Sequence, residues 1–194
     1  MRKNYNSDDF KLHIANIALD LFREKGYNNV SIDLICKEAE ISKSGFYYHF
    51  KEKSDTFSFY YSRTNSNVDE LIQHLLLDAN PAEKLWLIMK QYLQQTVDDG
   101  AEFVKSVLSI NLYDNKKVFS YKDAHSRTIY LNLLAKARSE GLIHSEIEDN
   151  DELIDLYLTT TLGITYKWCL TNSDFDYFEE CKKAFEVVFG YKLK

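Results

Sequence analysis

Two short segments near the N-terminus, each opened by a serine, constrain the fold of this chain more than any other feature. The second segment covers residues 42–51, where four aromatic residues and a histidine follow a small, polar first turn. Ser42 is a good N-cap, because its hydroxyl can accept a hydrogen bond from a free amide of the first helical turn. The segment predicts a helix that is too short and too polar on its outer face to be a core helix.

The first segment has a matching form. Ser31 can cap a second short helix whose apolar residues recur at helical spacing: Ile32, Ile35, Cys36 and Ala39. Residues 40–41 join the two segments, so together they predict a helix-turn-helix. The second helix of such a motif can lie in a DNA major groove, with its N-terminal residues at base edges and other side chains at phosphates.

In its order and spacing, this region resembles the TetR-type transcriptional regulators over roughly residues 8–57. The resemblance is carried by an apolar first helix, the turn after it, the two serine-capped helices and an aromatic run that ends in lysines: Ile14, Ala18, Leu21, Phe22, Glu24, Lys25, Gly26, Tyr27, Ser31, Ile32, Ala39, Ile41, Ser42, Lys43, Tyr47, Tyr48, His49, Phe50, Lys51, Glu52 and Lys53. It implies an all-α fold in which a three-helix helix-turn-helix domain precedes a larger helical domain for ligand binding and dimerisation.

Some positions depart from the family pattern. Glu40 stands where the family usually has a glycine in the turn, which predicts either a strained positive φ or a different turn. Ser44 and Gly45 replace a common Gly-Thr pair, which affects the base-reading contacts more than the fold. Glu52 stands where a better capping residue usually opens the fourth helix.

Residues 1–52 are therefore expected to bind double-stranded DNA. Phe46 and Phe50 lie four residues apart and claim the inward face of the second short helix, so we expect Tyr47 and Tyr48 to face outward. The alternative is that both tyrosines belong to the core. The expected DNA contacts are Ser31, Ser42, Lys43, Ser44, Gly45, Tyr47, Tyr48, His49, Lys51 and Lys53.

The rest of the chain is predicted to be helical as well, because only one proline and six glycines occur among 194 residues. The expected helices lie near 7–25, 53–77, 81–98, 101–113, up to 140, 149–170 and 175–191. Residues 53–194 are expected to form the ligand-sensing and dimerisation domain. The helix predicted over 53–77 begins beside lysines and would link the two domains mechanically.

Charge is distributed unevenly along the chain, whose net charge is −6. Residues 1–65 hold ten basic and nine acidic residues, whereas residues 66–194 hold 14 and 21. The acidity therefore belongs to the C-terminal part, and only the N-terminal part is suited to a phosphate surface. No run of 18 apolar residues and no apolar signal core occur, so we expect a cytoplasmic protein without a membrane partner.

The last two predicted helices are unusually apolar. The helix over 149–170 carries apolar residues all round, as expected for a helix buried on more than one side. The pattern and the family resemblance both predict a homodimer in which these helices form a four-helix bundle, so that the operator is an inverted repeat. The alternative is a core within one chain. The expected interface residues are Leu158, Leu162, Tyr166, Cys181, Phe185 and Val188.

Aromatic residues are abundant in the C-terminal part, more so than a small core needs. They predict an apolar pocket with a few polar handles for a small apolar or aromatic effector. The alternative for each residue taken singly is an ordinary place in the core. The candidate ligand contacts are Trp86, Tyr92, Phe103, Tyr113, Tyr130 and Tyr166.

Catalytic and metal-binding patterns were sought and do not occur in the sequence. The five histidines are scattered, and no phosphate loop, nucleophile elbow or metal-ligand spacing is present. Cys36, Cys169 and Cys181 form no ligand pair and are expected to be small buried hydrophobic residues; the alternative is a thiol sensor. We therefore expect no enzyme activity and no cofactor. The rival hypothesis is an all-α carrier or enzyme in which the helix-turn-helix is only structural.

Overall fold

The computed structural model describes residues 7–60, 79–113 and 124–193, and every regular element within these ranges is helical. The described residues form two compact units. The first contains residues 7–60 and 102–113, and the second contains 79–101 and 124–193. The all-α prediction is confirmed. None of the helices in these ranges is long and apolar enough to cross a membrane.

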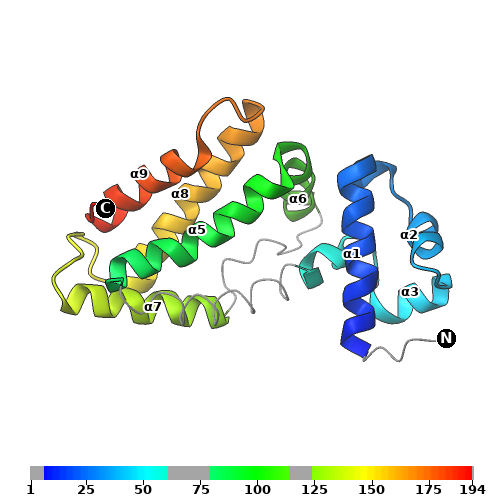
Figure 1. The fold of residues 1–194 in the computed structure, drawn as a ribbon, viewed down its shortest axis with the longest axis horizontal. Coiled ribbons are helices and arrows are strands. Elements are labelled where there is room, and N and C mark those ends of the chain that lie inside the picture. The colour runs from blue at the N-terminus through cyan, green and yellow to red at the C-terminus, as the bar shows by residue number, and fades with distance from the viewer. Residues whose placement is uncertain (1–6, 61–78, 114–123, 194) are drawn as a thin grey trace. The chain divides into compact units, whose positions relative to one another are not determined.

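The first unit is built on α1 (Ser7–Lys25), with α2 (Ile32–Glu38) and α3 (Lys43–His49) packed beside it (Figure 1). The predicted bounds of α1 are confirmed, and Ile14, Ala18 and Phe22 are buried as expected. Gly26 follows with φ 79° and leads into the short 3₁₀ helix η1 (Tyr27–Asn29). Because L side chains rarely adopt such a φ, a glycine is favoured at this helix end.

The serine caps shape the next two helices. Ser31 caps α2 (Ile32–Glu38) by accepting a hydrogen bond from the Leu34 N–H, and Ser42 caps α3 (Lys43–His49). Glu40, in the turn between them, has φ 53°. The prediction of a positive φ at this position is thus confirmed, and the turn keeps the form that a glycine would serve better.

The core of the first unit draws on residues far apart in the sequence. Phe57 stacks on Phe22 with ring centroids 4.9 Å apart, and Phe103 of α6 (Ala101–Tyr113) packs against Phe57 at 5.4 Å. The predicted bounds of α6 are confirmed, and the buried side of this helix belongs to the same core. The helix predicted over 53–77 is helical at 55–60. Its remainder, 61–78, lies outside the described residues.

The second unit begins with α5 (Pro81–Asp99), whose predicted start and end are confirmed. Asn80 caps it by accepting hydrogen bonds from the Ala82 and Glu83 N–H groups. It packs against α7 (Ala124–Ser139), after which Gly141 has φ 69°. The break predicted at 114–117 lies outside the described residues.

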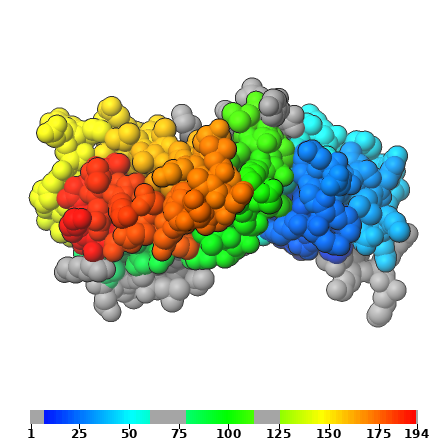
Figure 2. Space-filling model, turned by 90° about the horizontal axis from the view of Figure 1, so that it is seen from above, coloured from blue at the N-terminus to red at the C-terminus, as the bar shows by residue number. Residues whose placement is uncertain are grey.

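The unit is completed by α8 (Asn150–Leu170) and α9 (Tyr177–Phe189), which pack along each other and lie side by side on one face in Figure 2. The last helix was predicted over 175–191 and is shorter at both ends. Asp176 caps its start by accepting from the Glu179 N–H, and Gly190 ends it in the left-handed conformation. All three cysteines are buried, as expected.

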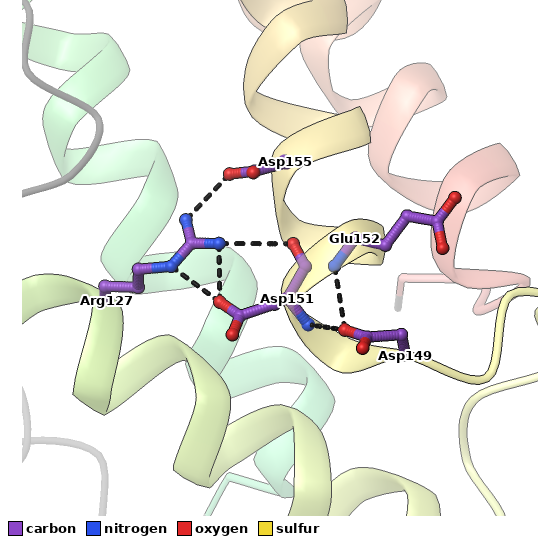
Figure 3. Close-up of polar contacts among 5 residues, drawn as sticks. All are labelled: Arg127, Asp149, Asp151, Glu152 and Asp155. Carbon is purple, nitrogen blue, oxygen red and sulfur yellow. Dashed lines mark hydrogen bonds and ion pairs between the residues drawn. The ribbon is translucent and has the colours of Figure 1, made fainter.

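A charged clasp ties α7 to the first turns of α8 (Figure 3). The Arg127 guanidinium donates to Asp151 at 2.6 Å and to Asp155 at 2.7 Å, while Asp149 caps α8. The two carboxylates raise the pKa of Arg127, and its side chain is only 18% exposed. The clasp therefore joins α7 to α8 through different nitrogens of one planar guanidinium, which contact two carboxylates at once.

Candidate functional site

The candidate recognition face is the outward side of α3, where the aromatic residues divide into a buried and an exposed group. Phe46 is fully buried and Phe50 is 3% exposed, and both pack into the core of the first unit. Tyr47 is 54% exposed and Tyr48 is 82% exposed. Their predicted outward orientation is confirmed. Two large exposed aromatic side chains on a short helix offer apolar surface and hydroxyl groups to a partner.

The start of α3 is held by serine hydroxyls. The Ser42 hydroxyl accepts a hydrogen bond from the Gly45 N–H at 3.1 Å and lies 2.9 Å from the Ser44 hydroxyl. A Cβ on Gly45 would lie 3.4 Å from Ser42 Oγ and 3.7 Å from Ile41 Cβ, which are ordinary contacts. Packing within the protein therefore does not require glycine at this position, and the bare backbone leaves room for an outside partner to approach.

Lys43, the first residue of α3, is paired with an acid of α2. Its Nζ lies 2.7 Å from Asp33 Oδ1, and the two side chains are 62% and 64% exposed. The ion pair raises the pKa of Lys43. The sequence offered no functional signal for Asp33, because an acidic residue in a first helical turn is ordinary.

His49 ends α3 and is half-buried. Its ring lies 5.6 Å from the Phe10 ring and 4.9 Å from the Tyr48 ring. Burial, and then the charge of nearby Lys11, lower the pKa of His49. Lys11 itself lies over the Phe59 ring at 4.5 Å, a contact that sequence reasoning missed because it joins α1 to the chain beyond α3.

The two lysines after α3 have different environments. Lys51 is exposed, and its backbone N–H donates to Asp55 at 2.9 Å, as does that of Glu52 at 3.1 Å. The Lys53 ammonium donates to the carbonyl oxygens of Tyr27 at 2.7 Å and Val30 at 2.8 Å, and burial lowers its pKa. Lys53 therefore closes the turn after α1, and its ammonium also lies over the Tyr27 ring at 4.0 Å.

The candidate ligand contacts do not form one group. Tyr92 and Tyr130 lie together with ring centroids 6.3 Å apart, and the Tyr92 hydroxyl is 3.0 Å from that of Ser126. Trp86 packs on Phe185 instead. The remaining three lie apart: Phe103 in the core of the first unit, Tyr166 on the surface at 56% exposure, and Tyr113 at the end of α6 with its side chain outside the described part.

The candidate interface residues divide by exposure. Cys181 and Phe185 are fully buried within the single chain, so they offer no surface to a second copy, and their place in the expected interface is corrected. Leu158, Leu162 and Val188 are half-buried, and Tyr166 is exposed. Three of these lie four residues apart on α8, and Leu170, which is 64% exposed, extends the row.

Comparison with known proteins places the helix-turn-helix in a described family. The sequence profile of the family described as "Bacterial regulatory proteins, tetR family" matches residues 14–57. The TetC protein of transposon Tn10 from Escherichia coli is 33% identical over 105 residues, which are 53% of each chain. The HTH-type transcriptional regulator AcrR of Shigella flexneri is 37% identical over 95 residues, or 48% of this chain and 44% of AcrR. The chain thus spans about half the length of these curated relatives.

The fold likeness extends over nearly the whole chain. A structure of Thermus thermophilus FadR, described as a TetR-family transcriptional repressor in complex with lauroyl-CoA, covers 95% of both chains with a TM-score of 0.71 and 16% identity. At that level of sequence identity, the likeness shows a shared fold and does not show a shared ligand or function.

Proposed function

The chain belongs to the TetR family of transcriptional regulators, and we propose that it is a repressor that binds an inverted-repeat operator as a homodimer and leaves it when a small apolar or aromatic molecule binds. Membership of this family argues against the alternative hypothesis of an enzyme, because the family consists of regulators. The observation that carries the proposal is the outward face of α3, where Tyr47 and Tyr48 are exposed above the buried anchors Phe46 and Phe50.

DNA contact is assigned to the exposed and half-buried residues around α3. The proposed base-edge group is Lys43, Ser44, Gly45 and Tyr47, and the proposed phosphate group is Ser31, Ser42, Tyr48, His49 and Lys51. Lys53 remains a proposed phosphate contact, but a weaker one, because two of its N–H groups already donate to carbonyl oxygens. The two serines already use their hydroxyls as caps, and a hydroxyl that accepts one bond can still donate to a phosphate.

The test is binding to a duplex that carries the upstream region of the protein's own gene. Tyr47→Ala should abolish the specific complex and leave weak, salt-sensitive binding. Gly45→Ala is a second and milder variant, because the family commonly has a larger residue at this position and alanine stabilises a helix interior by about 1 kcal/mol relative to glycine. Lost binding in a protein that is at least as stable cannot be attributed to misfolding. Wild-type affinity in both variants would contradict the recognition face, and sequence-blind binding by the wild type would favour a carrier.

Dimerisation through α8 and α9 is supported by the apolar residues that remain on their surface. Leu158, Leu162, Tyr166 and Leu170 follow one another at four-residue spacing on α8, and Val187 of α9 is 82% exposed. Gly163 and Thr159, both exposed, keep the surface between them small. A two-fold dimer with one recognition helix per copy fits an inverted repeat whose half-sites lie one DNA turn, or a small multiple of it, apart.

Effector binding is proposed around α5 and α7. Tyr92 and Tyr130 supply aromatic surface, and the paired hydroxyls of Tyr92 and Ser126 supply a polar handle. Lauroyl-CoA, the molecule bound to FadR, is a suitable probe, because its lauroyl chain is apolar. Titrated against the protein alone and against its operator complex, an effector must bind the free protein more tightly, because coupling is reciprocal. Equal affinity for both would exclude lauroyl-CoA as the releasing molecule.

A further inference from the structure

An acidic residue lies within the face assigned to DNA. Asp33, in the first turn of α2, reaches across the turn of the helix-turn-helix to Lys43, and the two side chains are 64% and 62% exposed with 2.7 Å between Oδ1 and Nζ. Tyr47 follows Lys43 by four residues and is also exposed. An exposed ion pair contributes little to stability, because water screens it and both side chains lose freedom. The stability of the fold therefore does not explain the pair.

A carboxylate in this position can bind only hydrogen-bond donors or positive charges. Phosphate oxygens repel it, so an aspartate beside the backbone of a duplex would weaken every complex alike. In the major groove, the groups that can donate to a carboxylate are the exocyclic amines, N4 of cytosine and N6 of adenine. Ammonium groups, in turn, pair with the O6 and N7 acceptors of guanine.

A single G·C base pair places an acceptor for the ammonium and a donor for the carboxylate side by side. In a G·C pair, guanine O6 and cytosine N4 are joined by a hydrogen bond, so these two atoms are separated by a hydrogen-bond length. The ammonium of Lys43 and the carboxylate of Asp33 are separated by the same kind of distance and have the opposite order of donor and acceptor. The ion pair is thus complementary to the major-groove edge of a single G·C pair.

We propose that Asp33 is a specificity and positioning residue, which holds the Lys43 ammonium at a base edge and, together with it, reads one G·C pair in each half-site. The inference rests on the proposed function, since it requires that α3 enters the major groove. Asp33 acts in two ways: its second oxygen accepts from the cytosine amine, and its charge keeps Lys43 from turning to a phosphate.

Removing the charge of Asp33 should convert Lys43 from a base reader into a phosphate binder. A paired lysine contributes no net positive charge, whereas an unpaired lysine at a phosphate releases a counterion. The plot of log affinity against log salt should therefore steepen by about 0.9 per recognition helix in Asp33→Asn. Non-specific affinity should rise while the preference for G·C at one position disappears.

The experiment uses a pool of duplexes with a randomised stretch, from which full-length protein selects its preferred inverted repeat. Single-base variants of that repeat are then titrated. The wild type should prefer G·C at one position of each half-site by about tenfold. Asp33→Asn and Lys43→Met should both lose that preference at the same position and keep the others. Asp33→Glu, which retains the carboxylate, should restore part of it.

Glu38→Gln is the matched control, because it removes one exposed negative charge from the same helix at a residue outside the proposed pair. It should raise the affinity for all duplexes alike and leave the base preferences unchanged. The inference is wrong if Asp33→Asn behaves like this control, or if its base preferences equal those of the wild type. If the wild type enriches no repeat from the pool, the proposed function fails as well, so the two failures are distinguishable.

Discussion

Glu40 adopts a backbone conformation that a residue with a side chain does not favour. Its φ of 53° lies in the left-handed region, which costs a residue with a Cβ roughly 1–2 kcal/mol. Glu40→Gly removes that strain but adds freedom to the unfolded chain, so we expect the free energy of unfolding to rise by about 1 kcal/mol. Urea unfolding followed by circular dichroism measures it.

Glu38→Gly serves as the control for this prediction. Glu38 is the last residue of α2 and is exposed, so glycine there should lower stability by up to about 1 kcal/mol. If both glycine variants were destabilised equally, the left-handed conformation at Glu40 would carry no strain.

His49 gives stability a dependence on pH. Its pKa in the folded protein is lowered by burial and by Lys11, so the unfolded chain takes up a proton first as the pH falls. The contribution of neutral His49 to the free energy of unfolding is present above the ordinary histidine pKa of about 6.5. It is lost as the pH falls through the lower pKa that His49 has in the folded protein. Wild type should lose more stability than His49→Gln between about pH 7.5 and pH 5. Parallel losses in urea unfolding would contradict this.

We expect bound DNA to shift the pKa of the same residue in the opposite direction. Phe10 and Lys11 of α1 and Tyr48 of α3 surround the His49 ring, and none of them is an acid. A phosphate placed beside the ring would be the nearest negative partner and would raise its pKa. Duplex binding by the wild type should therefore strengthen as the pH falls from about 7.5 to 6, while His49→Gln shows a flatter profile.

At the scale of helices, the starts were readable from the sequence because their signals are local. Ser31, Ser42 and Asn80 each accept a hydrogen bond from an amide two or three residues later, so the cap and its helix occur in the same short stretch. The last helix was predicted too long because its apolar pattern continues past Asp176 and Gly190, which stop it.

Contacts between distant segments were not readable in this way. Lys53 bonds to carbonyl oxygens 26 and 23 residues earlier, and Arg127 reaches acids 24 and 28 residues later. Each pairing depends on how helices pack, and a single sequence has many lysines and acids that could serve. For the same reason Phe103 was expected to contact a ligand and proved to be part of a core.

The end of α9 depends on a glycine for a steric reason. Gly190 has φ 60°, and a Cβ there would lie 2.3 Å from the carbonyl oxygen of His144, whose own N–H donates to the Phe189 carbonyl oxygen at 3.1 Å. Gly190→Ala must therefore move the backbone, and we expect the free energy of unfolding to fall by more than ~1 kcal/mol. Gly45→Ala, whose new Cβ meets only ordinary contacts, should be stabilised instead. Thermal unfolding of the two variants should shift in opposite directions.

At the scale of the whole molecule, we expect the row of apolar residues on α8 to decide the oligomeric state. Leu162 is half-buried in the single chain and lies at the middle of the row that runs from Leu158 to Leu170. A glutamate at Leu162 would be an unpaired charge within the proposed interface, which is strongly unfavourable. We expect Leu162→Glu to be a monomer by light scattering at micromolar concentration, where the wild type is a dimer.

The matched control is Leu112→Glu, which places the same charge on an exposed leucine of α6. This variant should keep the dimer mass, because its residue lies outside the proposed interface. Loss of the dimer should also weaken operator binding, since each copy then holds a half-site alone and the second helix no longer benefits from the first. A monomeric wild type, or a Leu162→Glu variant that remains dimeric and binds operator normally, would place the interface elsewhere on the chain.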